Sequence, residues 1–268
     1  MSVAEYTASA KDIAELRQMT GAGLLDCKNA LEEADGDIEK AAQILREKGL
    51  AGAAKRSDRD ASEGAVAAVR SGDAAAVVEL RCETDFVAKS GEFVALADEL
   101  AALVAAKGED ATSELEGEIE RLRTTLKENI SVGRVRRLVA EPGQVVDTYV
   151  HRQNDRGVNA VALVLDGGSE ELAHDIAVHI AFTKPSYLSR DEVPEDEVAA
   201  ERATLETISR NEGKPEAALP KIIDGRLTGW FKERVLLEQG YVRDEKQTIS
   251  AMLGSARIVA FAQVVIGA

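Results

Sequence analysis

The first 50 residues combine helical apolar spacing with two clear breaks. Ile13 and Leu16 share one face of a first helix, which the segment Thr20-Gly21-Ala22-Gly23 ends. In the next helix, the positions expected to face inward are Leu24, Cys27, Leu31 and Ala34. The Asp35-Gly36-Asp37 turn supplies an N-cap for a third helix, which we expect to end at Gly49. The pattern predicts a small three-helix bundle.

A change of composition follows the bundle. Residues 51–62 are rich in Ala, Gly and charged side chains, which is typical of a linker. The periodicity then changes to that of an α+β unit, which we expect to cover residues 63–141. Its expected elements are strands at 64–70 and 74–81 around a Ser71-Gly72-Asp73 turn, helices at 91–107 and roughly 113–129, and a strand at 132–139.

A similar order of elements recurs in the second half of the chain. The expected elements are strands at 145–152 and 158–165, a turn at 166–168 and a helix at 170–182. Because a hairpin followed by a helix occurs twice, we predict two related α+β subdomains packed as one core. The second subdomain is expected over 142–186, with a final part at 241–268 whose last strand, 258–266, completes its sheet.

The segment between these two parts, residues 187–240, is predicted to be an antiparallel helical hairpin. Helices are expected at 194–211 and 215–238. The second carries a continuous apolar stripe formed by Leu219, Ile222, Ile223, Leu227, Trp230 and Phe231. A stripe of this length packs on the chain itself or on a second copy, so a homodimer through the hairpin is one expectation.

Composition narrows the classes of partner. The chain has 48 acidic and 33 basic residues, a formal net charge of −15, which argues against nucleic acid as a partner. No apolar run approaches the ~20 residues of a membrane-spanning helix. The N-terminus also lacks the basic and apolar regions of a signal peptide. We therefore expect a cytoplasmic protein with no membrane partner.

The sequence contains none of the motifs tested for catalysis or cofactor binding. There is no P-loop, GxSxG or HExxH motif, and Cys27 and Cys82 match no metal-ligand spacing. His174 and His179 lie about 140° apart around a helix, which argues against a shared metal and favours a structural role. We expect no bound metal, no cofactor and no direct nucleotide binding.

Two segments place unusual residues together. Leu25 and Lys28 lie off the inward stripe of the second helix and suggest a docking face. The segment Glu83-Thr84-Asp85-Phe86-Val87-Ala88-Lys89 places an acid beside an aromatic ring at a strand-to-helix turn. Phe86 would be an anchor for a partner's pocket, with Asp85 competing for donors or a cation. Alternatively, Asp85 caps the next helix and Phe86 packs onto the core as a staple.

These segments also resemble a known family. The bundle is similar in pattern to a ubiquitin-associated domain, and LRQMTGAGLLDCKNALEEADGD (16–37) and ETDFVAK (83–89) resemble signatures of translation elongation factor Ts. Further similar segments are Glu63-Gly64, His179-Ile180-Ala181 with Lys184-Pro185, and GKPEAALPKIIDGRL (213–227). Members of that family promote guanine-nucleotide exchange on elongation factor Tu.

The resemblance implies specific contact residues for elongation factor Tu. The intruding acid and aromatic match Asp85 and Phe86, within the signature that includes Thr84 and Val87. The remaining contacts match Arg17, Leu24, Leu25, Lys28 and His151. The family has a methionine pair where this chain has two leucines, an apolar exchange that should preserve docking.

The resemblance implies an exchange factor rather than an enzyme. The factor and GDP would weaken each other's binding to elongation factor Tu by the same amount, because binding free energies are linked reciprocally. The wedge would act by disrupting the Mg²⁺ and phosphate site, since losing the metal removes the charge that neutralises the phosphates. A second interpretation is a non-catalytic adaptor that binds a protein through the bundle. A hydrolase is a third, but no defined carboxylate pair supports it.

Overall fold

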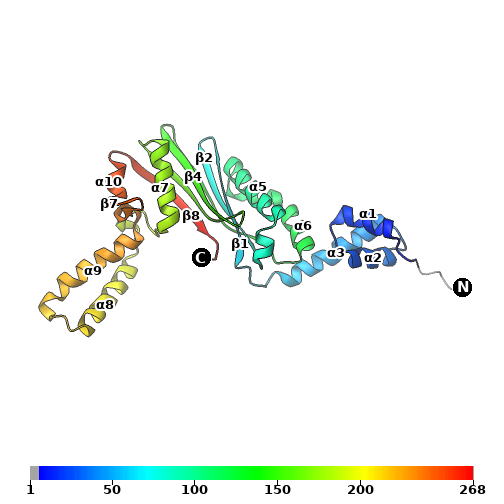
Figure 1. Ribbon diagram of the computed structural model, residues 1–268, viewed down its shortest axis with the longest axis horizontal. Helices are drawn as coiled ribbons and strands as arrows, with labels where there is room; N and C mark the ends of the chain where they lie inside the picture. The colour runs from blue at the N-terminus through cyan, green and yellow to red at the C-terminus, as the bar shows by residue number, and fades with distance from the viewer. Residues whose placement is uncertain (1–5, 268) are drawn as a thin grey trace.

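The computed structural model describes residues 6–267 and shows an elongated molecule (Figure 1). The N-terminal helices lie at one end, antiparallel sheets covered by helices form the middle, and a helical hairpin extends at the other end (Figure 1). The α+β class expected from the sequence is confirmed.

The N-terminal bundle has a small core of its own. It consists of α1 (Ala10–Thr20), α2 (Leu24–Glu33) and α3 (Ile38–Arg56). Its buried residues are Ile13, Leu16, Cys27, Ala30, Leu31, Ala34 and Ala41. The placement of Leu24 in the inward stripe is wrong, because α2 begins at this residue and its buried positions start one turn later. The side chain of Leu24 is 59% exposed.

The third helix is longer than the sequence predicted. It continues past Gly49 to Arg56, so the segment 51–56 is helical rather than linker, and only residues 57–62 lie outside regular structure before the first strand. The reason is local: the sequence AGAAKR has no proline, is rich in the best helix former, and places two basic residues at the negative end of the helix dipole.

The first subdomain is a three-stranded antiparallel sheet with helices on one face. Its strands are β1 (Glu63–Ser71), β2 (Ala74–Cys82) and β3 (Ser131–Val139), in the order β1-β2-β3. The helical segments are α4 (Asp85–Ala88), α5 (Gly91–Lys107), η1 (Glu109–Leu115) and α6 (Glu116–Leu126). Phe93, Leu96 and Leu100 of α5 pack with Leu80 and Ile119 in the core of this subdomain.

The second subdomain repeats this plan. Its strands are β4 (Gln144–Gln153), β5 (Arg156–Asp166) and β8 (Arg257–Val265), in the order β4-β5-β8, with α7 (Glu170–Thr183) packed on the sheet. In each subdomain a hairpin is followed by a helix, and the later third strand pairs with the second strand of the hairpin. The expected pairing of the last strand is confirmed.

The two sheets pack face to face. Val66, Val77, Ala160, Val164 and Val264 belong to the shared layer of small apolar side chains between them. A Cβ atom added at Gly157 of β5 would lie 2.1 Å from the carbonyl oxygen of Val66, so the close approach of the two sheets requires glycine there. The helices therefore cover only the outer faces, giving layers of helix, sheet, sheet and helix (Figure 1).

The helical hairpin lies between the second subdomain's main part and its last strand. It consists of α8 (Glu195–Asn211) and α9 (Leu219–Arg234), with short 3-10 turns η2 (Arg190–Glu192), η3 (Glu216–Ala218) and η4 (Leu236–Glu238) around them. A small ribbon of β6 (Gly240–Tyr241) and β7 (Asp244–Thr248) then leads to α10 (Ile249–Leu253). The sequence did not predict this ribbon, because its strands are short and β7 is mostly polar.

The hairpin covers most of its own apolar stripe, with Ile222 and Trp230 half-buried. Leu219, Ile223, Leu227 and Phe231 of α9 are all buried. Phe231 packs with Val193, Val235, Val198 and Leu205, and the guanidinium of Arg190 lies 4.3 Å from the centre of its ring. The stripe therefore has intramolecular partners and does not need a second copy.

We expect the protein to be a monomer at micromolar concentration, because most of the longest apolar stripe is already covered within the chain. Sedimentation velocity over a range of concentrations measures this directly. A dimer that persists on dilution, and that is lost when exposed Ile208 on α8 is replaced by Glu, would show instead that the hairpin self-associates.

Candidate functional site

The most exposed large apolar side chain among the described residues is Phe86. It lies on α4, a single helical turn directly after β2, and its side chain is 82% exposed. Thr84 is the N-cap of α4, and its hydroxyl accepts a hydrogen bond from the backbone N–H of Val87. The next helix, α5, is capped by Ser90. The alternative in which Asp85 caps that helix and Phe86 is a core staple is therefore wrong.

Asp85 stands beside Phe86 as an ionised carboxylate. Lys89, one turn further on, donates a hydrogen bond to it at 2.5 Å, and this bond together with the nearby positive charges holds the pKa of Asp85 below its usual value. The side chain remains 43% exposed. We call the exposed pair Asp85 and Phe86 the wedge.

Thr84 and Val87, the signature residues on either side of the wedge, hold the turn in place. Val87 packs against the core of the first subdomain, and Ala88 is fully buried. Thr84 is half-buried and holds the start of the turn. The sequence grouped Thr84 and Val87 with the wedge, whereas the structure shows that they anchor the turn that presents it.

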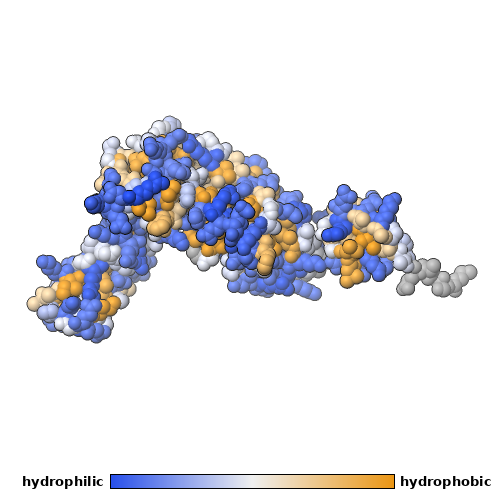
Figure 2. Space-filling model, in the orientation of Figure 1, coloured by the Kyte–Doolittle hydropathy of each residue, from blue (hydrophilic) through white to orange (hydrophobic). Residues whose placement is uncertain are grey.

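The contact residues expected on the bundle are all exposed. Leu24 and Leu25 are 59% and 67% exposed at the start of α2, and Arg17 and Lys28 are also exposed. Figure 2 shows apolar surface on the bundle bordered by polar atoms. We call these four residues the docking face. Sequence reasoning missed Met19, which is 60% exposed at the end of α1; its position off the Ile13 and Leu16 stripe was the available signal.

His151 lies at the same end of the sheets as the wedge. It is exposed on β4, close to the β4–β5 turn, whose residues Asn154 and Asp155 both have positive φ. Arg156 follows this turn and donates hydrogen bonds to the carbonyl oxygen of Gly64 at 2.7 Å and to Glu63 at 2.9 Å. Because Glu63 pairs with Cys82 at the end of β2, the hairpin end that carries His151 is fastened beside the strand leading into the wedge.

Comparison with known proteins shows the family of this chain. The family model described as Elongation factor TS matches residues 83–268, beginning at the first residue of the wedge signature. Elongation factor Ts of Clavibacter michiganensis subsp. michiganensis is 49% identical over 280 residues, covering 99% of this chain and 100% of that protein. The chain belongs to the elongation factor Ts family.

Two further relatives extend the match. Elongation factor Ts of Renibacterium salmoninarum is 45% identical over 283 residues, covering 99% of this chain and 100% of that protein. The protein of the same name from Mycobacterium ulcerans is 46% identical over 264 residues, covering 96% and 95% of the two chains. The resemblance to elongation factor Ts found in the sequence is thereby confirmed.

In this member of the elongation factor Ts family, the other chemically reactive side chains are in structural settings. Cys27 and Cys82 are buried, and burial raises the pKa of the Cys82 thiol to about 12, so it stays protonated. Within residues 6–267, no cluster of His, Cys, Asp and Glu side chains is suited to hold a metal ion. In the same range, every helix is too short or too polar to cross a membrane.

His174 and His179 have different environments on α7. His174 is exposed, with its Nδ1 atom 2.9 Å from Asp147. His179 is fully buried: its Nε2 lies 3.0 Å from the side-chain oxygen of Gln239, and its Nδ1 accepts from the backbone N–H of Val242. Both nitrogens are thus used by the neutral ring, and burial lowers the pKa of His179 below its usual value of 6.5.

We expect His179 to make the protein less stable as the pH falls below about 6.5, because the unfolded chain then takes up a proton that the folded ring resists. The free energy of unfolding, measured by urea titration at about pH 7.5 and about pH 5.5, should fall more for the wild type than for His179→Gln. Equal losses in both proteins would mean that other groups cause the acid sensitivity.

Proposed function

We propose that the protein is a guanine-nucleotide exchange factor that binds elongation factor Tu and promotes GDP release during translation elongation in the cytoplasm. The observation that carries the proposal is the wedge. Phe86 is 82% exposed on a one-turn helix, and exposing an aromatic ring to water is unfavourable in free energy unless a partner covers the ring. Family membership identifies the partner that the proposal names.

In the proposed mechanism, one surface binds elongation factor Tu and another disrupts its nucleotide site. The docking face would hold elongation factor Tu through the apolar contacts of Leu24 and Leu25, with Arg17 and Lys28 adding charge complementarity. Phe86 would enter packed structure beside the Mg²⁺ and phosphate region, and the ionised Asp85 would compete for the groups that hold the metal. His151, at the same end of the sheets, would add a contact from the second subdomain.

The consequence is mutual weakening of two ligands. Suppose that elongation factor Tu can accommodate the wedge only when its metal site is distorted. Bound GDP must then weaken the binding of the exchange factor by the same factor by which the exchange factor weakens the binding of GDP. No covalent bond is made or broken in this scheme. The protein therefore needs no catalytic acid, base or nucleophile, and we propose that it acts as a regulator of a GTPase rather than as an enzyme.

The proposal is tested by mixing the protein with elongation factor Tu loaded with fluorescent GDP and following nucleotide release by stopped flow. Acceleration that increases with factor concentration and then saturates is the expected result. A protein that binds elongation factor Tu without accelerating release would instead be the adaptor considered from the sequence, using the docking face alone.

We expect Asp85→Ala to slow GDP release by a factor that depends on free Mg²⁺. The carboxylate can act on the metal site only while the metal is bound, so the deficit should be clear at millimolar Mg²⁺ and should vanish in excess chelator. Stopped-flow release at both conditions measures this. Asp85→Asn, which keeps the size and removes the charge, should behave like Asp85→Ala; a deficit that is unchanged by chelator would exclude action through the metal.

A further inference from the structure

A three-residue turn after α6 contacts the bundle, the linker and the segment that leads into the wedge. We call residues 127–129 the joint turn. Lys127 ends α6 in the left-handed conformation, with φ of 58°, and its ammonium group lies 2.8 Å from Asp26 on α2. Asp26 directly follows Leu25 of the docking face. The next two residues face the wedge and the linker instead.

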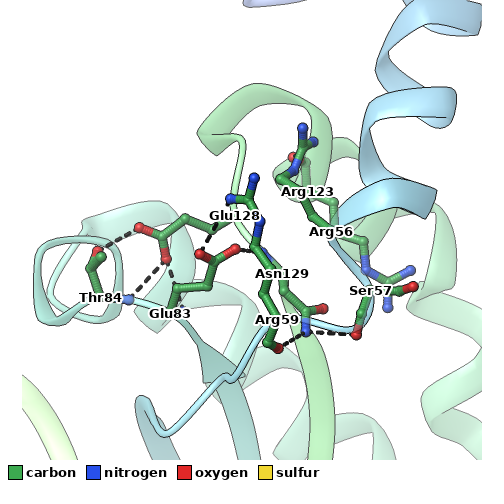
Figure 3. A network of polar contacts seen from close by, with 8 residues as sticks. All are labelled: Arg56, Ser57, Arg59, Glu83, Thr84, Arg123, Glu128 and Asn129. Atoms are coloured by element: carbon green, nitrogen blue, oxygen red, sulfur yellow. Dashed lines mark hydrogen bonds and ion pairs between the residues drawn. The ribbon is translucent and has the colours of Figure 1, made fainter.

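The carboxylate of Glu128 accepts hydrogen bonds from the two residues that lead into the wedge (Figure 3). One carboxylate oxygen accepts hydrogen bonds from the backbone N–H groups of Glu83 at 3.0 Å and Thr84 at 3.1 Å. The other oxygen accepts from the hydroxyl of Thr84. A bond also runs in the opposite direction, because a carboxylate oxygen of Glu83 accepts from the backbone N–H of Asn129 at 2.7 Å. These bonds fasten the joint turn to the N-cap of α4.

Asn129 fastens the linker at the same place. Its side-chain amide donates to the carbonyl oxygens of Ser57 at 3.0 Å and Arg59 at 2.7 Å (Figure 3). Arg59 in turn lies 3.4 Å from the carboxylate of Glu83. The linker that carries the bundle and the segment that leads into the wedge are therefore bound to one turn of the core.

The wedge depends on this external support for its direction. An isolated helical turn is unstable because nucleation costs more than one hydrogen bond returns. The N-cap bond from Val87 to Thr84 is long, at 3.4 Å. Phe86 itself is too exposed to be held by packing. Its orientation is thus set by the backbone of α4, which is held by the burial of Ala88, the packing of Val87 and the three bonds to Glu128.

We propose that Glu128 is a positioning residue for nucleotide exchange: through the N-cap of α4 it presents the wedge in a fixed direction relative to the bundle. This inference rests on the proposed function and deepens it. Glu128 is half-buried and its carboxylate is directed at Glu83 and Thr84, so it acts through the wedge rather than by contact with the partner.

The test is the rate of GDP release as a function of factor concentration for the full-length Glu128→Ala variant. We expect the maximal rate at saturating factor to fall about tenfold, the effect of losing hydrogen bonds to a charged group. The half-saturating concentration should change little, because the docking face is intact. Glu128→Gln retains one acceptor oxygen, so its maximal rate should lie between those of the wild type and Glu128→Ala.

The separate effects on the maximal rate and on the half-saturating concentration distinguish a positioning role from a loss of folded protein. Unfolding of part of the sample lowers the active concentration, which raises the apparent half-saturating concentration and leaves the maximal rate unchanged. The matched control is Glu118→Ala, the same substitution at an exposed site on α6, for which both values should equal those of the wild type. A Glu128→Ala variant whose maximal rate equals that of Glu118→Ala would overturn the inference.

A double-mutant cycle checks the route of action. If Glu128 acts through Phe86, adding Glu128→Ala to Phe86→Ala should slow release by less than about twofold further. Fully multiplicative effects would show that the two residues act independently and would also overturn the inference. Failure of the proposed function is distinguishable, since the wild-type protein would then not accelerate GDP release at all.

Discussion

Replacing Phe86 by Ala should slow the exchange reaction about thirtyfold at sub-saturating factor, because a buried hot-spot aromatic contributes roughly 2 kcal/mol or more to binding its partner. The ring is 82% exposed in the free protein, so its contacts would form only when elongation factor Tu is bound. For the same reason, the free energy of unfolding of the variant should remain close to that of the wild type. Stopped-flow GDP release and thermal unfolding of the same samples give both quantities.

Phe182 provides a matched control for this prediction. It is an aromatic side chain on α7 of the second subdomain and is 73% exposed, so Phe182→Ala removes a similar surface group from an element other than α4. Its exchange rate should equal that of the wild type. Equal losses for both variants would mean that the assay responds to surface hydrophobicity in general, and an unaffected Phe86→Ala variant would remove the wedge from the mechanism.

Glu79→Ala should lower the free energy of unfolding by about 3 kcal/mol, because it leaves two guanidinium groups without their shared carboxylate. Glu79 is 2% exposed on β2 and accepts hydrogen bonds from the side chains of Arg81 at 3.0 Å and Arg134 at 3.0 and 3.2 Å. Burial opposes its ionisation, but the hydrogen bonds from Arg134 and Arg81 outweigh burial and keep the pKa of Glu79 below its usual value.

The position of this carboxylate explains the size of the expected effect. Arg134 also donates to the carbonyl oxygen of Val265 on β8, so the pair connects the two sheets. Urea denaturation measures the loss, and Glu99→Ala, an exposed change on α5, should stay within about 0.5 kcal/mol of the wild type. A similarly small change for Glu79→Ala would mean that water enters and solvates the two arginines.

Local and periodic features were predictable from the sequence. The strands of both hairpins, the amphipathic α5 and the two long helices of the helical hairpin follow from short-range spacing of apolar residues and from turn residues such as Gly72. These elements are decided by interactions within a few residues, so the sequence contains the information directly. The end of α3 was missed because the change of composition at residue 51 suggested a linker, although its alanines favour helix.

The arginines show where local interpretation fails. From the sequence, Arg134 and Arg59 belong to basic clusters, which are usually solvated faces or charges on strand edges, and neither partner is indicated. In the structure, Arg134 binds a buried carboxylate on a neighbouring strand, and Arg59 lies beside Glu83. The partners are 55 and 24 residues away in the chain. Spacing within a segment carries no information about such contacts.

The sequence by itself determined the order of the main helices and strands, the signatures of the family and the presence of an acid beside an aromatic at residues 85 and 86. Only the tertiary structure decided whether that aromatic is a core staple or an exposed wedge, because a one-turn helix has no periodicity to reveal which side faces the core. The answer depends on the packing of Val87 and Ala88 and on the bonds from Glu128, which comes from a turn more than 40 residues later. Contacts over such separations form only when the subdomain folds, and they give Phe86 its exposed position.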